Sequence, residues 1–224
     1  MHYTIINQDV KLLTDPDVID NQFPYLLEYA GRVCTATEDK VGTGTDTMGF
    51  LKKLLNSKHM SVFEHCSVTV ELTTSRAISH QLVRHRIAAY SQQSMRYVKF
   101  TTKDSIKIIE PQGCDKWSVD MRDVWEQSIY DAVDSYERLI ILGAPAEVAR
   151  GVLPHDTATK LVATWNLREL LHILYDPHCG RYANRHAQAQ VRQLMTILRY
   201  ELASKSEFMK WLFETYENNT DNVQ

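Results

Sequence analysis

Residues 81–97 concentrate side chains that could hold a flat, anionic, hydrogen-bonding ligand. Arg84, His85 and Arg86 stand side by side, and Ser94 and Arg96 follow a polar run. A guanidinium offers a planar fork of donors that matches phosphate oxygens, and Ser and Gln add neutral hydrogen bonds. The segment therefore predicts a site for a phosphorylated ligand. The same cations would also suit the last turn of a helix, where they complement the helix dipole.

A second cluster lies at residues 59–65, where two histidines flank Ser61 and Glu64. His59, Glu64 and His65 are spaced i, i+5, i+6, which does not place all three on one helix face as metal ligation from a helix requires. This spacing favours a hydrogen-bonding role, and we expect no metal.

Three further clusters follow along the chain. Arg150 ends a short helical pattern, residues 165–172 read as an amphipathic helix, and Arg181 and Arg185 precede the last long helical pattern. Taken locally, Arg150 could be a surface charge that complements a helix dipole, whereas Arg185 would sit in the first turn of the last helix, where a cation opposes the dipole.

The pair His155-Asp156 is typical of metal-dependent nucleotide phosphohydrolases. Such a site needs further His and Asp ligands on separate helices, and the sequence offers no convincing set. We favour an ordinary loop pair after Pro154, with the hydrolase kept as an alternative.

Arg-His-Arg followed after seven residues by Ser94, and continued as Ser-Met-Arg-Tyr, resembles the signature of flavin-dependent thymidylate synthases. The segments 59–65, 147–154, 165–172 and 181–188 also resemble that family, in the right order. Two positions depart from its pattern, because Val62 replaces a proline and Gln92 replaces a carboxylate. The interval before the final arginine is also longer, so Arg181 and Arg185 compete for one role, with Arg181 favoured.

The resemblance implies that FAD is bound and that dUMP becomes dTMP, with methylenetetrahydrofolate as carbon donor and NADPH as reductant. It implies a homotetramer with active sites at subunit interfaces. The implied cofactor contacts are Ser61, Glu64, Arg84, His85, Arg86, Gln92, Asn166, Leu167, Arg168 and His172. The implied substrate contacts are Gln81, Arg84, Gln92, Gln93, Ser94, Met95, Arg96, Arg150 and Arg181, of which Arg181 polarises the pyrimidine. C5 modification of another pyrimidine nucleotide, or a flavin-binding regulator without turnover, remain alternatives.

Composition fits such a protein. The 224 residues are 44% hydrophobic and 24% charged, with a net charge of −3, which argues against a nucleic-acid-binding surface. The four cysteines are scattered, and neither a signal peptide nor an apolar run long enough for a membrane is visible. We expect a cytoplasmic protein with one domain, residues 1–217, and a polar tail, residues 218–224.

Hydrophobic periodicity predicts helices with a modest sheet. The resemblance implies an α/β fold, which we expect to be of the α+β type with helices around a largely antiparallel sheet. Strands or extended segments are expected at 3–13, 67–73 and 94–101. Helices are expected at 17–36 (firm from Pro24), 46–57, 75–86, 118–142, 145–150, 165–175 and 184–203.

Overall fold

The computed structural model describes residues 3–43, 46–100, 106–176 and 187–220. Its strands are β1 (Tyr3–Ile6), β2 (Asp9–Leu12), β3 (Ser67–Ser75), β4 (Ala89–Gln92), β5 (Ile106–Ile109) and β6 (Ala158–Asn166). Its α-helices are α1 (Pro16–Val33), α2 (Thr47–Asn56), α3 (Arg76–Leu82), α4 (Val119–Ile141), α5 (Ala146–Ala149), α6 (Leu167–Tyr175), α7 (Ala189–Lys205) and α8 (Glu207–Thr220). Short 3-10 helices are η1 (Glu38–Lys40), η2 (Met60–His65), η3 (Cys114–Lys116) and η4 (Arg150–Val152). No helix in these ranges is long and apolar enough to cross a membrane.

A four-stranded antiparallel sheet has the order β2-β3-β6-β4, and a separate parallel pair joins β1 to β5. The predicted fold class is confirmed. The chain forms two compact units: unit 1 comprises Met1–Asp9, Leu72–His85 and Tyr90–Val162, and unit 2 comprises Val10–Glu71, Arg86–Ala89 and Ala163–Gln224. Strands β3 and β6 each contribute residues to both units. The assignment of residues 1–217 to a single domain stays a prediction.

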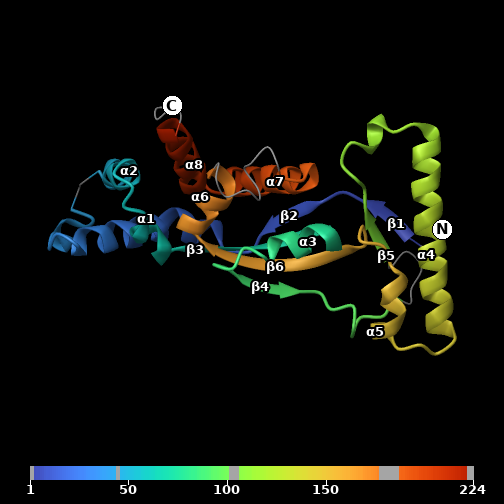
Figure 1. The fold of residues 1–224 in the computed structure, drawn as a ribbon. Coiled ribbons are helices and arrows are strands. Elements are labelled where there is room, and N and C mark those ends of the chain that lie inside the picture. The colour runs from blue at the N-terminus through green and yellow to red at the C-terminus, as the bar shows by residue number, and fades with distance from the viewer. Residues whose placement is uncertain (1–2, 44–45, 101–105, 177–186, 221–224) are drawn as a thin grey trace. The chain divides into compact units, whose positions relative to one another are not determined.

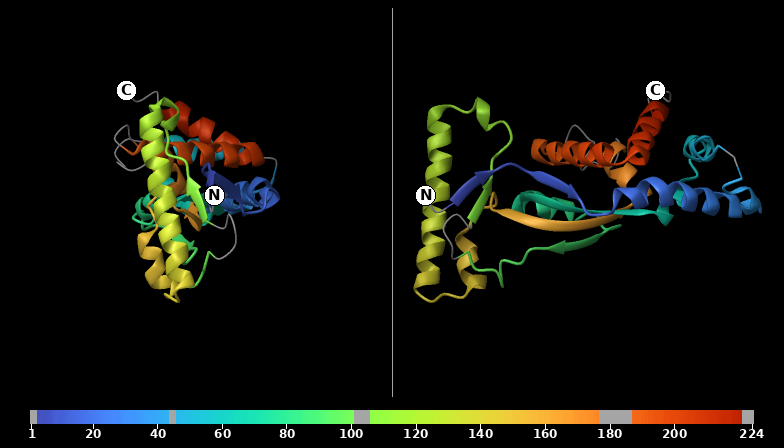
Figure 2. Two further views of the ribbon diagram at one scale, coloured as in Figure 1. Left: turned by 90° about the vertical axis from the view of Figure 1, so that its right-hand side faces the viewer. Right: turned by 180° about the vertical axis from the view of Figure 1, so that it is seen from behind.

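The core of unit 1 lies between the β1–β5 pair and one face of α4 (Figures 1 and 2). Apolar residues recur along α4 at helical spacing, and Ile129, Val133 and Tyr136 are buried against Tyr3 and the isoleucines of β5. The Ser118 side chain caps the start of α4 by accepting a hydrogen bond from Met121 N. This packing carries the chain from α4 into α5 and η4, where Arg150 lies.

Unit 2 is mostly helical. Asp15 caps α1, and Asp20 further along α1 accepts hydrogen bonds from Ser206 Oγ and Phe208 N at 2.5 and 3.0 Å, which holds the start of α8. The helix α1 packs on α2, η2 and α8, and η2 packs on α6. These contacts position η2, which carries Ser61 and Glu64.

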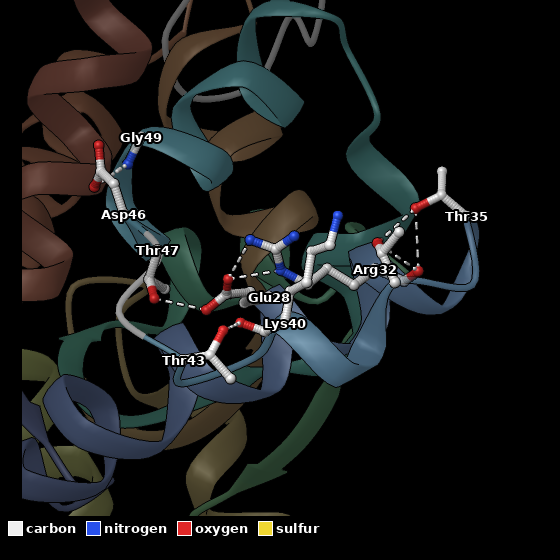
Figure 3. A network of polar contacts seen from close by, with 9 residues as sticks. Glu28, Arg32, Thr35, Lys40, Thr43, Asp46, Thr47 and Gly49 are labelled. Atoms are coloured by element: carbon white, nitrogen blue, oxygen red, sulfur yellow. Dashed lines mark hydrogen bonds and ion pairs between the residues drawn. The ribbon is translucent and has the colours of Figure 1, made fainter.

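A buried ion pair within α1, Glu28–Arg32, is hydrogen-bonded to Thr47 at the start of α2 (Figure 3). Glu28, 1% exposed, accepts a 2.7 Å hydrogen bond from Arg32 Nε and a 2.6 Å bond from Thr47 Oγ1. The Arg32 guanidinium also lies 4.5 Å from the centre of the Phe50 ring. Both partners are therefore satisfied within the helix pair.

The structure corrects several predicted boundaries. The helix α1 begins at Pro16 and continues through Pro24, because the Asp15 cap and the buried face formed by Ile19 and Phe23 outweigh the single hydrogen bond that Pro24 cannot donate. Helix α8 extends to Thr220, into the stretch predicted as tail.

Strands β4, β5 and β6 were missed. In β6 the buried positions Thr159, Leu161, Ala163 and Trp165 alternate regularly, but Thr and Ala give this alternation little hydrophobic contrast. Within the described part of the predicted extended segment 94–101, residues 95–97 instead form a turn after β4, where Val98 N donates to Ser94 O.

Candidate functional site

The chain leaves α3 just before the Arg84-His85-Arg86 cluster. Helix α3 ends at Leu82, and Tyr90 Oη donates a 3.0 Å hydrogen bond to Leu82 O. The prediction of a helix that continues to Arg86 is therefore wrong. The Tyr90 hydroxyl, from strand β4, donates a hydrogen bond to the last carbonyl of the helix. The local sequence around Leu82 does not predict that contact.

The three cluster residues differ in exposure. His85 is only 8% exposed, whereas Arg84 and Arg86 are exposed. Across the described residues, neither guanidinium forms an ion pair with a carboxylate. Both charges are therefore available to an anionic ligand.

Unit 1 contains a cavity of about 470 Å³ beside α3. Its walls are Arg76, His80, Gln92, Met95, Arg150, Leu153, Pro154 and His155. None of these described lining residues carries a carboxylate, and two are arginines. The cavity is thus chemically suited to an anion.

Arg76 is held rigidly at this cavity. Its Nε donates to Met95 Sδ at 3.0 Å, and its Nη1 donates to Gln93 O at 3.3 Å and Thr159 Oγ1 at 3.2 Å. Burial lowers the pKa of Arg76, and the charge of Arg150 lowers it further. Two neighbouring cations without a counter-ion on the cavity wall favour the binding of an anion.

Gln92 is fixed by two hydroxyl groups. Its Nε2 donates to Ser79 Oγ at 2.8 Å and to Thr159 Oγ1 at 3.3 Å. A carboxylate at this position could only accept, whereas Ser79 Oγ already donates to Arg76 O at 2.9 Å. An amide is therefore compatible with its surroundings here.

The turn after β4 presents Ser94 and Arg96, two further predicted substrate residues of unit 1. Ser94 Oγ accepts a 3.2 Å hydrogen bond from Arg96 N, and the Arg96 guanidinium lies 3.7 Å from Glu147 and over the Tyr97 ring. The Arg96–Glu147 pair is more than half exposed, so it contributes little stability and can yield to a ligand.

Unit 2 brings together most of the predicted flavin contacts, because η2 packs on the start of α6. Arg168 Nη1 donates to Glu64 Oε1 at 2.5 Å, which joins the two elements directly. Asn166 caps α6 by accepting from Glu169 N at 2.9 Å. Leu167 is completely buried, so only its backbone can face a ligand, and Leu167 N already donates to Cys66 O. Ser61 lies on the exposed side of η2.

Further along α6, His172 Nδ1 lies 2.9 Å from Asp176 Oδ2, one helical turn away. The carboxylate fixes the imidazole orientation on a half-exposed face. Arg181 and Arg185 lie outside the described residues.

Sequence reasoning missed Arg76 and His80, and it interpreted His155 as a plain loop residue. The i, i+4 spacing of Arg76 and His80 on α3 was a usable signal. His155 and Asp156 do not act as a pair, because Asp156 Oδ2 accepts a 3.2 Å hydrogen bond from Trp125 Nε1 while His155 lines the cavity.

Comparison with known proteins defines the class. Residues 19–206 match the family model described as "Thymidylate synthase complementing protein". A flavin-dependent thymidylate synthase of Geobacter sulfurreducens is 40% identical over 172 residues, covering 74% of this chain and 71% of the relative. One from Pyrococcus furiosus is 30% identical over 190 residues, covering 83% and 75%.

A solved structure of a UMP/dUMP methylase, PolB from Streptomyces cacaoi bound with 5-Br dUMP, has a similar fold. Its TM-score is 0.73 at 24% identity, covering 96% of this chain and 97% of that one. The fold and the sequence matches together indicate an enzyme of the methyltransferase class. This chain belongs to the flavin-dependent thymidylate synthase family, and its cofactor is FAD.

The residues present fit that cofactor. FAD carries a diphosphate, and the exposed Arg84 and Arg86 supply guanidiniums without a described carboxylate partner. The η2–α6 region adds hydroxyl, amide and imidazole groups from Ser61, Asn166 and His172. Arg86 and these η2–α6 groups all belong to unit 2 and are of the kinds that bind a diphosphate and a hydrogen-bonding ring system.

Proposed function

We propose that the protein methylates dUMP at C5 to give dTMP, with methylenetetrahydrofolate as carbon donor and NADPH as reductant. The observation that carries the proposal is the cavity of unit 1, where Arg76 and Arg150 face one space whose described walls lack a carboxylate. A nucleotide monophosphate brings the dianion that such a space favours. Family membership supplies the reaction class.

In this proposal the phosphate of dUMP lies at the cavity. Arg150 and Arg96 contact it, with Ser94 and the neighbouring turn positioning it. Gln81, Gln92, Gln93 and Met95 contribute around the nucleotide, and Arg76 joins them as a residue that the sequence did not single out. In this proposal the protein binds dUMP and orients it, because its fixed side chains disfavour other orientations of the nucleotide.

The flavin is held by Arg84, His85 and Arg86, by the η2 residues Ser61 and Glu64, and by residues at the start of α6. FAD, when bound, supplies two-electron redox chemistry. The Arg168–Glu64 pair and the Asp176–His172 contact hold these groups in place for the ligand. In the net reaction the pyrimidine gains a methylene group and a hydride and loses its C5 proton, and tetrahydrofolate and NADP⁺ leave.

We further propose a homotetramer in the cytoplasm with active sites at subunit interfaces, and a role for Arg181 in polarising the pyrimidine carbonyl. A positioned cation there would stabilise charge as it develops on the ring. Arg181→Ala should then reduce turnover while NADPH still reduces the flavin, and Arg185→Ala should act more mildly. The reverse ranking would transfer the role to Arg185.

The direct test uses the purified full-length protein. It should be yellow, its flavin spectrum should change on adding dUMP, and dTMP should form only when methylenetetrahydrofolate and NADPH are both present. Flavin binding without any response to dUMP would favour a regulator without turnover.

A second candidate substrate is UMP, because the structural neighbour from Streptomyces cacaoi is named as a methylase of UMP as well as dUMP. Parallel assays with UMP and dUMP decide between them. We expect product from dUMP, and preferential methylation of UMP would replace the first proposal.

A further inference from the structure

Two histidines share the cavity with the arginines and have no part in the reaction described above. His80 lies on α3 one turn after Arg76, so both side chains occupy the same helix face. His155 lies in the loop between η4 and β6. The two imidazole centres are 6.2 Å apart, with the rings nearly perpendicular at 80°.

Backbone hydrogen bonds fix this arrangement. Ala77 N donates to His155 O at 3.1 Å, and Arg76 N donates to Thr157 O at 3.0 Å. Thr157 is only 1% exposed, and its hydroxyl donates to Pro154 O. The loop that carries His155 is therefore attached to the first turn of α3, and the backbone amides of Arg76 and Ala77 are already engaged.

The charges around the imidazoles favour an anion. On β4 and β6 the side chains on this side, Gln92 and Thr159, are uncharged. The acids on adjoining segments are engaged elsewhere, since Glu147 pairs with Arg96 and Asp156 accepts from Trp125. Without a ligand, a protonated imidazole would therefore meet two guanidiniums and no counter-ion among the described walls.

We propose that His80 and His155 form a proton-dependent part of the phosphate subsite, so that the cavity selects a dianionic phosphate and binds it with an affinity that depends on pH. This inference rests on the proposed function, in which dUMP is the substrate. Binding is coupled to uptake of a proton by an imidazole from solvent, and dissociation returns it. The two arginines supply permanent charge, and the histidines add charge that depends on pH.

The direction of the pH effect follows from general titration behaviour. A phosphate monoester becomes a dianion above about pH 6, and imidazoles lose their charge between about pH 5 and 8. The dissociation constant for dUMP should therefore be lowest near about pH 6.5. It should rise about fivefold by about pH 8.5, the loss expected for one charge-assisted hydrogen bond at a partly exposed site.

The test is titration calorimetry of the FAD-loaded full-length protein with dUMP at about pH 6.5 and 8.5, on either side of the imidazole titration. Two buffers with different ionisation enthalpies count the protons. In wild type, binding at the lower pH should take up protons and be tighter. The variant His80→Asn/His155→Asn should lose both effects. His80→Lys carries a permanent charge and should keep tight binding at the higher pH, which a purely structural role would not produce.

Two controls separate the possible causes. Arg138→Met removes an exposed cation of α4 outside the cavity and should behave as wild type. Deoxyuridine lacks the phosphate, so its binding should show no proton uptake. If the double Asn variant binds dUMP with the wild-type pH dependence, the histidine proposal is overturned while the proposed function stands. If wild type binds no dUMP at either pH, the proposed function fails, and this inference fails with it.

Discussion

Replacement of Arg76 by methionine separates a binding role from a structural one. Methionine preserves much of the side-chain length but removes the charge. The loss of one charge-assisted contact to phosphate should cost about 1.5–3 kcal/mol of binding free energy. The dissociation constant for dUMP should then rise about ten- to a hundredfold.

The effect on folding should be smaller. Arg76→Met removes hydrogen bonds to Gln93 O and Thr159 Oγ1, each worth about 1 kcal/mol. However, burial and Arg150 lower the pKa of Arg76, which means that the folded protein disfavours its charged form. Removing the charge relieves that penalty, so the free energy of unfolding should fall by only about 1 kcal/mol.

The assay pairs dUMP titration of the FAD-loaded protein with urea unfolding of the same preparation. Arg138→Met on α4 is the matched control, because its guanidinium is 75% exposed and contacts only Asp134 among the described residues. The control should leave both quantities unchanged. An Arg76→Met protein with wild-type dUMP affinity and a large loss of stability would refute the assignment.

Three further outcomes are expected. Arg96→Ala and Arg84→Ala should each weaken dUMP binding about ten- to a hundredfold with little loss of stability. Only the Arg84 variant should also release FAD. Unchanged dUMP affinity in titrations of the Arg96 variant would remove that residue from the site. Burial raises the pKa of Cys66 to about 12, so this thiol should resist a thiol reagent at about pH 8. The variant Cys66→Ala should keep turnover if it folds. Loss of activity with flavin still bound would show that the thiol takes part in catalysis. Glu28→Ala should destabilise unit 2 by about 3–5 kcal/mol in urea unfolding, because it leaves the Arg32 charge buried without its carboxylate. Replacing both Glu28 and Arg32 by leucine should recover stability. An unchanged unfolding midpoint for Glu28→Ala would exclude a stabilising role for the ion pair.

The sequence predicted those helices and strands in which apolar and polar residues alternate with a clear helical or strand period. The alternation of β3 and the long apolar stripe of α4 are explicit in the residue types, and the caps Ser75 and Ser118 mark where helices begin. The clusters around η2 and α6 that we propose to bind the flavin were also identifiable from the sequence. Of these, Glu64 and Arg168 prove to be in direct contact across 104 positions in sequence.

The remainder depends on contacts between distant segments. The end of α3 at Leu82 is fixed by a tyrosine hydroxyl from β4, which periodicity does not report. Arg76 and Arg150 line the same cavity, and hydrogen bonds join α3 to the loop before β6. The strand β6 was not predicted, because Thr and Ala at its buried positions gave little hydrophobic alternation. A cavity lined by residues from distant segments can be predicted only when the pairing of the strands is known.

The path of β3 and β6 affects how such a protein can be divided or recombined. Each compact unit is assembled from separated stretches of the chain, and the boundary cuts β3 after Glu71 and β6 after Val162. No continuous segment of the gene therefore encodes either unit. A truncated product would expose severed strand edges that promote aggregation, and exchanging one unit between relatives would require several simultaneous crossovers. Point substitutions within one gene can therefore modify the cationic cavity of unit 1 or the η2–α6 region of unit 2, whereas a single crossover cannot exchange either unit as a module.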